Sequence, residues 1–396
     1  MTKHKAIWLF AGGQMQVSVA QKVVRADYRL ILTDMNPECM CAAYAHDFVA
    51  CDTFDVSGNL QAAERLREKY QICAVLTVAA DCHETVAILN RHLGLHGISP
   101  DISRACRQKN VTRTTLTAAG IPQPRFSCVN NLEDARSFLV ELGGQGVIKA
   151  TDNSASRGFS KLDSLDELTN AVFQAAISAG TTGFVLIEEA LVPLSDCISE
   201  LSVETLWFNG KMYWLNWVDR LFRYDLKFFS ELCDYEEDQI GWGVEVGHIN
   251  PAQHPFAVKM ETEKLLHAAG VALGMAHEVG GHILKADIML TRSGPIIIEM
   301  TPRLSGGWDS SATTPARGAD FQGGAIQLAL GATLTLDLWL DYFEFNNASL
   351  YASILADISP NAKDCIGREF ALGVGFDRDQ SLQLSLNNLK EKKHVL

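Results

Sequence analysis

Apolar segments and amphipathic stretches alternate along the first hundred residues of the chain. The apolar segment KAIWLF (5–10) ends in Ala-Gly-Gly, and a stretch with helical spacing, MQVSVAQKVVRAD (15–27), separates it from the apolar RLILTDMN (29–36). The alternation continues in QAAERLREKY (61–70), ICAVLTVAAD (72–81) and HETVAILNRHLGL (83–95). Strand, helix and strand in this order predict a doubly wound parallel sheet over residues 1 to about 105.

The glycines after the first predicted strand form a candidate nucleotide-binding turn. The dinucleotide fingerprint Gly-x-Gly-x-x-Gly falls here on Ala11, Gly13 and Gln16, so two of its three glycines are absent. Gly12 and Gly13 instead permit a tight turn from strand to helix. The pattern therefore argues against a dehydrogenase.

A second block of elements is predicted between residues 104 and 191. RACRQKNVTRTTLTAAG (104–120) has helical spacing, and the IPQP that follows stiffens the exit from it. Next come a strand GVIKA (146–150), a loop of small residues (151–162), a helix (164–180) and a strand GFVLIEEAL (183–191). This compact unit is expected to form a lid lobe on a larger body.

The rest of the chain favours antiparallel strands. Polar and apolar residues alternate on both sides of an Asn-Gly dipeptide in 198–220, which predicts a hairpin. The segment EVGHINP (245–251) and predicted helices at 255–274 and 318–331 follow, and the tail from about residue 333 has no clear pattern.

Two apolar segments form a second predicted hairpin. ILKADIML (283–290) and GPIIIEMTPRLSGG (294–307) are joined by TRSGP, which has the residues of a tight turn. If the turn is centred on Ser293, Leu290 faces Ile296. The Ile-Met-Leu and Ile-Ile-Ile runs favour strands that are covered on both faces over a solvated hairpin.

The same register places two acids, Asp287 and Glu299, opposite each other. Their Cβ atoms would lie about 5 Å apart, where like charges repel by roughly 3 kcal/mol at an effective dielectric near 20. A shared proton, a nearby lysine or a divalent cation would offset this repulsion. Because side chains alternate along a strand, Glu299, Thr301 and Arg303 are expected on the face of Asp287.

Composition and charge narrow the classes of function. Among 396 residues, 47% are hydrophobic and 20% are charged, which argues against disorder. A formal charge of −13 opposes binding to nucleic acid or an anionic membrane and favours a small polar substrate. No apolar stretch approaches the roughly 18 residues of a membrane span, and the first residues do not show a hydrophobic core followed by a small-residue cleavage site. Ten cysteines without a CxxC pair favour reduced thiols, so we expect a cytoplasmic protein.

The order and spacing of these segments resemble the ATP-grasp superfamily, in the style of its carbamoyl-phosphate-synthetase-like members and L-amino-acid ligases. The segments that carry the resemblance are QKNVTRTTLTAAGIPQPR, GVIKA, the small-residue loop, VLIEEAL, ELSVE, EVGHINP and the pair KADIML and IIIEMTPRLSGG. The resemblance implies a fold of α/β and α+β parts. A Rossmann-like pre-ATP-grasp domain is expected at 1–108, a lid subdomain with a linking helix at 109–186, and a catalytic lobe on a larger antiparallel sheet at 187–396.

The resemblance also implies how ATP is bound. In the family, two lysines contact the phosphates, a loop closes over the β- and γ-phosphates, a strand end holds adenine, and a carboxylate binds the ribose. In that order, the matching residues here are Lys109 and Lys149; Ser156, Arg157 and Gly158; Glu188, Glu189 and Leu191; and Glu200. Solvated lysines, an ordinary surface loop and an acidic strand end are the alternatives.

Three residues match the metal ligands of the family. Asp287 and Glu299 correspond to the magnesium carboxylates, and Thr301 stands where the family commonly has asparagine. The resemblance implies two Mg²⁺ ions, which Mn²⁺ can replace, and they would offset the repulsion between the acids.

The substrate side of the resemblance rests on the end of the hairpin and on EVGHINP. Arg303 falls where the family holds the substrate carboxylate or its acyl-phosphate, because a guanidinium binds such groups in a bidentate way. The backbone N–H groups of Gly306 and Gly307 would bind the same oxyanion. Expected pocket residues are Glu245, His248 and Trp308, with a structural histidine and a core tryptophan as alternatives.

The implied activity is an ATP-dependent carboxylate–amine ligase that joins small acids, such as amino acids, into amides or peptides through an acyl-phosphate. Its partners would be small-molecule carboxylates and amines, with no nucleic acid and no membrane, and we expect a homodimer. The alternatives are a ligase that acts on bicarbonate or on a nucleotide-pathway acid, and a non-catalytic nucleotide sensor.

Overall fold

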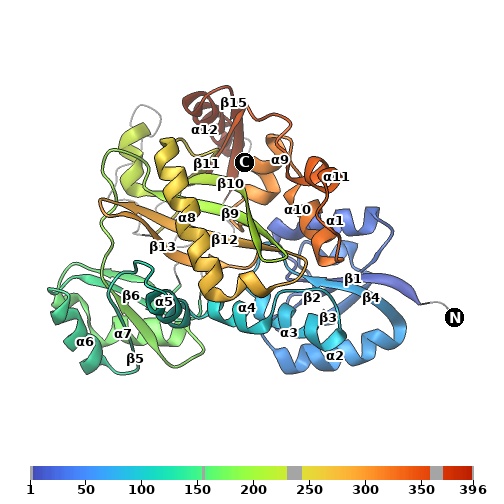
Figure 1. The fold of residues 1–396 in the computed structure, drawn as a ribbon, viewed down its shortest axis with the longest axis horizontal. Helices are drawn as coiled ribbons and strands as arrows, with labels where there is room; N and C mark the ends of the chain where they lie inside the picture. Colours follow the sequence, from blue (N-terminus) through green and yellow to red (C-terminus); the bar gives the residue numbers. More distant parts are fainter. Residues whose placement is uncertain (1–2, 154–156, 230–242, 357–368, 395–396) are drawn as a thin grey trace.

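The computed structural model describes residues 3–153, 157–229, 243–356 and 369–394, and its strands form three sheets (Figure 1). The first sheet has four parallel strands in the order β3, β2, β1, β4. Its elements in chain order are β1 (His4–Phe10), α1 (Val17–Arg25), β2 (Arg29–Asp34), β3 (Asp47–Ala50), α2 (Val56–Lys69), β4 (Tyr70–Leu76) and α3 (His83–Leu93). This alternation confirms the predicted parallel sheet.

Both faces of the first sheet are buried, as the alternating side chains of β1 show. Ile7 and Leu9 pack in one core with α1 and with α10 (Phe321–Ala329), which comes from far along the chain. Trp8 and Phe10 lie on the other face, in a core with α2 and α3. The first unit is therefore doubly wound, and a late helix completes one of its cores.

The helix predicted over 104–120 is two helices in the structure. α4 (Pro100–Arg107) and α5 (Lys109–Ala118) are separated by Gln108, whose backbone is extended with φ −90° and ψ 100°. The backbone N–H of Lys109 donates to the carbonyl oxygen of Thr151, 2.8 Å away in the second unit. The prediction of one helix is wrong because this bond to a distant segment replaces a bond within the helix.

The second sheet is antiparallel, in the order β5, β8, β6, β7. Its elements are β5 (Phe126–Val129), α6 (Leu132–Glu141), β6 (Gly146–Ala150), β7 (Ser160–Leu162), α7 (Asn170–Ala179) and β8 (Val185–Glu188). The strand predicted over 146–150 has those limits. The helix predicted from residue 164 begins later, because Thr169 caps it by accepting a hydrogen bond from the N–H of Val172.

The third sheet has seven antiparallel strands in the order β13, β12, β9, β10, β11, β14, β15. They are β9 (Glu200–Phe208), β10 (Lys211–Leu221), β11 (Gly247–Asn250), β12 (Gly281–Thr291), β13 (Gly294–Thr301), β14 (Tyr351–Ala356) and β15 (Phe370–Gly375). Asn209 and Gly210 form the predicted hairpin turn with positive φ angles of 48° and 77°. Helix α8 (Phe256–Leu273) lies across this sheet and packs on β9 and β12 (Figure 1).

The acidic hairpin confirms one predicted pair and corrects another. Leu290 faces Pro295, so the predicted pair of Leu290 with Ile296 is wrong by one residue. A bulge next to Asp287 then shifts the register by one, and Asp287 faces Glu299 as predicted. Because of this bulge, the two acids lie directly opposite each other on the neighbouring strands.

The tail that had no clear pattern contributes β14, β15 and the helix α12 (Arg378–His394). The domain limits at 108 and 186 remain predictions, and β8 runs across the second of them. All eight described cysteines are free, while Cys233 and Cys365 lie outside the described residues. No helix in the described part of the chain has the length and hydrophobicity to cross a membrane.

Candidate active site

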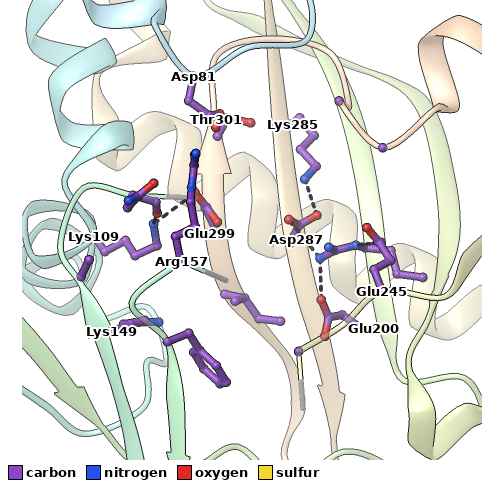
Figure 2. Close-up of a pocket in the computed structure, with 18 of the residues that line it drawn as sticks. Asp81, Lys109, Lys149, Arg157, Glu200, Glu245, Lys285, Asp287, Glu299 and Thr301 are labelled. Carbon is purple, nitrogen blue, oxygen red and sulfur yellow. Dashed lines mark hydrogen bonds and ion pairs between the residues drawn. The ribbon is translucent and has the colours of Figure 1, made fainter. Parts of the chain in front are cut away.

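A cavity of 580 Å³ lies where the three sheets meet (Figure 2). Its wall combines the loops after β1 and β4, the second sheet, and strands β9, β10, β12 and β13. The predicted site residues that line it are Lys109, Lys149, Arg157, Glu188, Glu189, Leu191, Glu200, Glu245, Asp287, Glu299, Thr301, Arg303, Gly306, Gly307 and Trp308. Gly158 and His248 do not line the cavity, and Ser156 lies outside the described residues.

On the second sheet, Lys149 forms an ion pair with Glu188, the acid predicted to lie beside adenine. Its Nζ lies 2.5 Å from Oε2 of Glu188, and burial lowers the pKa of Lys149 to about 8 despite this carboxylate. The other oxygen of Glu188 accepts from Nε of Arg113 at 2.6 Å. Glu188, which is predicted to lie beside adenine, is therefore part of a buried ion-pair network with Lys149 and Arg113.

Arg113 is a site residue that the sequence analysis did not identify. Its two terminal nitrogens donate to the carbonyl oxygens of Ile297 and Ile298, both at 2.9 Å, so it ties α5 to β13. Its spacing of four residues from Lys109 on one helix was the available signal.

The other two residues predicted to hold adenine, Glu189 and Leu191, would contact it through their backbones. The N–H of Glu189 donates to the carbonyl oxygen of Arg125 at 2.8 Å, which fixes the chain just after β8. The backbones of Glu189 and Leu191 remain the predicted contacts with the adenine edge.

Lys109 connects the second unit to the acidic hairpin. Its Nζ donates to the carbonyl oxygen of Asn153 at 2.5 Å and lies 3.3 Å from Oε1 of Glu299. Figure 2 shows this pair on one side of the cavity, across from Asp287. A nearby lysine, one of the three devices expected to offset the acidic pair, is therefore present at Glu299.

Asp287 has two cationic partners of its own. Nζ of Lys285 lies 2.5 Å from one carboxylate oxygen, and Nη1 of Arg220 lies 3.1 Å from the other. Burial would raise the pKa of Asp287, but these two cations outweigh it and lower the pKa. The repulsion between Asp287 and Glu299 is thus offset by cations of the protein itself.

Arg220 contacts three buried acids from three separate segments of the chain. Besides Asp287, its guanidinium lies 2.5 Å from Oε1 of Glu200 and 2.6 Å from Oε1 of Glu245. The hydroxyl of Tyr224 also donates to Glu200 at 3.4 Å. Burial raises the pKa of Glu200 to about 7 even with the arginine beside it. Arg220, which no sequence pattern predicted, is the shared cation of the acids predicted for ribose, metal and substrate.

The facing acids suit a magnesium ion. The hydroxyl of Thr301 is buried and makes no hydrogen bond within the described structure, so its oxygen is available to a metal ion. Across the described ranges, no three His, Cys, Asp or Glu side chains form a metal-binding group. Magnesium is typically held by one or two carboxylates together with substrate phosphates. Asp287 and Glu299 fit that role.

Arg303 meets the first domain at the end of the cavity. Its Nε and Nη2 donate to Oδ1 of Asp81 at 3.2 and 2.5 Å, and Nη1 donates to the carbonyl oxygen of Leu304 at 2.7 Å. Gly306 lies against the same loop, because a Cβ there would be 2.8 Å from the carbonyl oxygen of Ala79. No sequence pattern predicted a role for Asp81, which ends a predicted strand of another domain.

His248 lies behind the cavity wall rather than in it. Its Nε2 is 2.6 Å from Oε1 of Glu245, and its Nδ1 is 2.8 Å from Oδ1 of Asp309. Burial alone would lower the pKa of His248, but Asp309 and Glu245 outweigh it and raise the pKa to about 10. A cationic His248 therefore supports Glu245 and lies against Gly307, where a Cβ would be 2.6 Å from its ring. Of the two predicted pocket residues, Glu245 lines the cavity and His248 does not.

Trp308 occupies a strained backbone position in the cavity wall. Its φ is +70°, in the left-handed region that few residues other than glycine adopt. The indole ring packs 6.1 Å from His248 and 5.2 Å from Phe370, and its N–H has no hydrogen-bond partner among the described residues. Trp308 therefore lines the cavity and also packs against neighbouring rings, so both predicted alternatives describe its position.

No protein-family model matches the chain. A curated relative, the uncharacterized protein y4rH of Sinorhizobium fredii, is 24% identical over 311 residues and 74% of this chain. The chain covers 57% of that protein's length.

Solved structures match most of the chain. The L-amino acid ligase from Bacillus licheniformis has a TM-score of 0.67 at 18% identity and covers 90% of this chain and 80% of its own. An ADP complex of N5-carboxyaminoimidazole ribonucleotide synthetase has a TM-score of 0.70 at 15% identity and covers 99% of both chains. Phosphoribosylglycinamide synthetase from Anaerococcus prevotii has a TM-score of 0.63 at 14% identity, over 90% and 81%. Together with the three sheets, these matches show that the chain has the ATP-grasp fold.

Proposed function

We propose that the protein is an ATP- and Mg²⁺-dependent carboxylate–amine ligase. The observation that carries the proposal is the joint placement, in one cavity, of two lysines for phosphate, two facing acids for a metal, and one arginine for an acid. These are Lys109, Lys149, Asp287, Glu299 and Arg303. They come from helix α5, from the second sheet and from the acidic hairpin of the third sheet, so the arrangement depends on how these parts pack together.

The proposed reaction has two steps. A carboxylate oxygen of the acid forms a bond to the γ-phosphorus of ATP, and the bond between that phosphorus and ADP breaks. The amine nitrogen then attacks the acyl carbon, the carbon–oxygen bond to phosphate breaks, and the nitrogen loses a proton. No covalent bond to the enzyme is needed.

Residues of the chain supply charge and position in both steps. Lys109 and Lys149 neutralise the phosphates, while Arg303 holds the oxygens of the acid. The backbone N–H groups of Gly306 and Gly307 donate to the same oxygens. A magnesium ion between Asp287 and Glu299 would, when bound, neutralise negative charge on the phosphates.

The main alternative is a ligase for bicarbonate or a nucleotide-pathway acid. The names of two matched structures, the N5-carboxyaminoimidazole ribonucleotide and phosphoribosylglycinamide synthetases, favour this class. A nucleotide sensor without catalysis is the other alternative, because Thr301 replaces the usual asparagine.

The test is ADP release in the presence of ATP, Mg²⁺ and pairs drawn from the twenty amino acids, with mass detection of the products. We expect ADP release that depends on the acid and equals the amide formed. ADP release with bicarbonate and no amino-acid product would favour the alternative ligase. Tight ATP binding without any ADP release would favour the sensor and contradict the proposal.

A further inference from the structure

A short loop at the end of the acidic hairpin is packed between two parts of the molecule. We call residues 304–307 the glycine loop. On one side, a Cβ on Gly306 would be 2.8 Å from the carbonyl oxygen of Ala79, which follows β4. On the other side, a Cβ on Gly307 would be 2.6 Å from the ring of His248 in β11. Both glycines line the cavity, so the groups that touch this loop from behind set the direction of their backbone N–H groups.

Ser305, near the start of the glycine loop, is held by two buried acids. Its backbone N–H donates to Oε1 of Glu204 at 2.8 Å, and its hydroxyl donates to Oδ2 of Asp309 at 2.7 Å. Glu204 is 1% exposed and Asp309 is 0% exposed, so bulk water does not compete for these bonds. Neither acid is among the described residues that line the cavity. Both therefore act on the loop from behind and not on a bound ligand.

Asp309 also joins the glycine loop to β11. Nδ1 of His248 donates to Oδ1 of Asp309 at 2.8 Å, and the hydroxyl of Thr313 donates to the same oxygen at 3.2 Å. The carboxylate therefore accepts hydrogen bonds from the glycine loop, from β11 and from its own helical turn. It fixes both the hydroxyl of Ser305 and the ring against which Gly307 packs.

We propose that Asp309 is a positioning residue that fixes the glycine loop, and with it the N–H groups of Gly306 and Gly307, at the wall of the cavity. Charge-assisted hydrogen bonds are stronger than neutral ones, so the carboxylate holds the loop more firmly than a neutral side chain would. Donors that stabilise a developing negative charge do so best when they are held in place before the reaction. The inference rests on the proposed function and extends it, because it gives a role to a residue behind the cavity wall.

The first measurement follows the loop itself and does not depend on catalysis. Hydrogen exchange of the backbone amides in 304–308 is measured by mass spectrometry in the ligand-free wild type and in Asp309→Asn. Asparagine keeps the size of the side chain, but its amide nitrogen cannot accept the hydrogen bond from Ser305. We expect exchange in this segment to be at least about 10-fold faster in the variant, with exchange in β9 and β12 unchanged.

Turnover measures the consequence for the proposed reaction. With the amino acid that gives most product in the wild type, Asp309→Asn should lower kcat for ADP release by about 10- to 100-fold. The Kd of ADP in the presence of Mg²⁺ should stay nearly unchanged. Ser305→Ala removes only the hydroxyl that Asp309 holds and should also lower kcat, so the inference remains testable if Asp309→Asn does not fold. Because both changes break one contact, the double variant should be no slower than the slower single variant.

Asp219→Asn is the matched control for a loss of stability. Asp219 is 1% exposed, lies in β10 of the same sheet and, like Asp309, is paired with a histidine, with Nε2 of His254 at 2.8 Å. Neither Asp219 nor His254 is among the described residues of the cavity wall. This variant should lower the Tm while leaving loop exchange and kcat close to those of the wild type. An equal fall in kcat for both variants, or unchanged loop exchange in Asp309→Asn, would overturn the inference.

Failure of the proposed function would give a different result. If loop exchange rises in Asp309→Asn but the wild type forms no amide, the ligase proposal fails and the inference stands. If the wild type forms amide and Asp309→Asn has the same kcat, the inference fails and the ligase stands.

Discussion

Replacing Arg220 by methionine would leave three buried carboxylates without their shared cation. The guanidinium contacts Glu200, Glu245 and Asp287, and methionine keeps much of the length of the side chain but none of its charge. The variant therefore tests whether the cation holds together the acids that line the cavity.

The expected cost follows from the partners that remain. Removing one member of a buried ion pair typically costs roughly 3 to 5 kcal/mol. Asp287 and Glu245 each keep a second cationic partner, whereas Glu200 is left with the hydroxyl of Tyr224. We expect a loss of about 3 kcal/mol, at the lower end of that range, and a fall in Tm of no more than about 6 °C for a chain of this length.

The loss should depend on pH. Burial already raises the pKa of Glu200 to about 7, above the usual value of 4.5 in the unfolded chain. The neutral form is therefore the one that the fold favours, and this stabilisation is lost as pH rises through the folded pKa. Without Arg220 the folded pKa rises further, so the variant should lie closer to the wild type at pH 6 than at pH 8.5.

Thermal unfolding at both pH values, with and without MgCl₂ and without nucleotide, measures these effects. Mg²⁺ should raise the Tm of Arg220→Met more than that of the wild type, since it can replace the lost cation. The matched control Arg67→Met breaks an exposed pair with Glu64 and should not move the transition measurably. An unchanged Tm for Arg220→Met at pH 8.5, or an equal response of both proteins to Mg²⁺, would refute the reasoning.

Three further predictions concern the metal, the acid and the buried histidine. Glu299→Gln should lower turnover by about 100-fold or more without unfolding the protein, because a charged ligand of magnesium is lost; near-normal turnover would contradict the metal site. Arg303→Lys should keep ATP affinity within several-fold and lower kcat/KM for the acid by about 10² to 10³, because the bidentate contact is lost. Loss of ATP binding with an unchanged KM for the acid would instead place Arg303 at the nucleotide. His248, with its pKa raised to about 10, stabilises the fold fully below its usual pKa of 6.5, and this contribution is lost as pH rises to 10. The difference in Tm between wild type and His248→Gln should shrink over that range, and a difference independent of pH would refute the assignment.

Periodicity and turn residues predicted most elements, because they depend on local sequence. The hairpin at Asn209 and Gly210 and the strand over 146–150 follow from such signals. The break at Gln108 does not, because it depends on a hydrogen bond from Lys109 to a strand end in another unit.

Two bulges show why the partners of the acids were harder to predict. In the acidic hairpin, the assumed turn centre was wrong, and a bulge beside Asp287 compensated for the error. In the hairpin of β9 and β10, continuing the register of the turn would put Asp219 opposite Glu200. A bulge between Trp214 and Asn216 puts Arg220 there instead. No residue type in the sequence predicts either bulge. The contacts of Arg220 with the three acids therefore could not be predicted from the sequence.

Contacts between domains could not be predicted from the sequence either. Asp81 and Arg303 are separated by 222 positions, and only the packing of the first sheet against the third brings them together. Arg303 was predicted through the resemblance to the ATP-grasp superfamily, whereas nothing in the local sequence distinguishes Asp81 from an ordinary acid after a strand.

The most direct test of the proposed chemistry follows the oxygen atoms of the acid. An amino acid with both carboxylate oxygens labelled with ¹⁸O is incubated with ATP, Mg²⁺ and an amine that supports product formation, and the released phosphate is analysed by mass spectrometry. If an acyl-phosphate forms, one labelled oxygen leaves with phosphate and the amide keeps the other. Phosphate that carries one ¹⁸O per amide is the predicted result, and unlabelled phosphate released alongside amide would contradict the account.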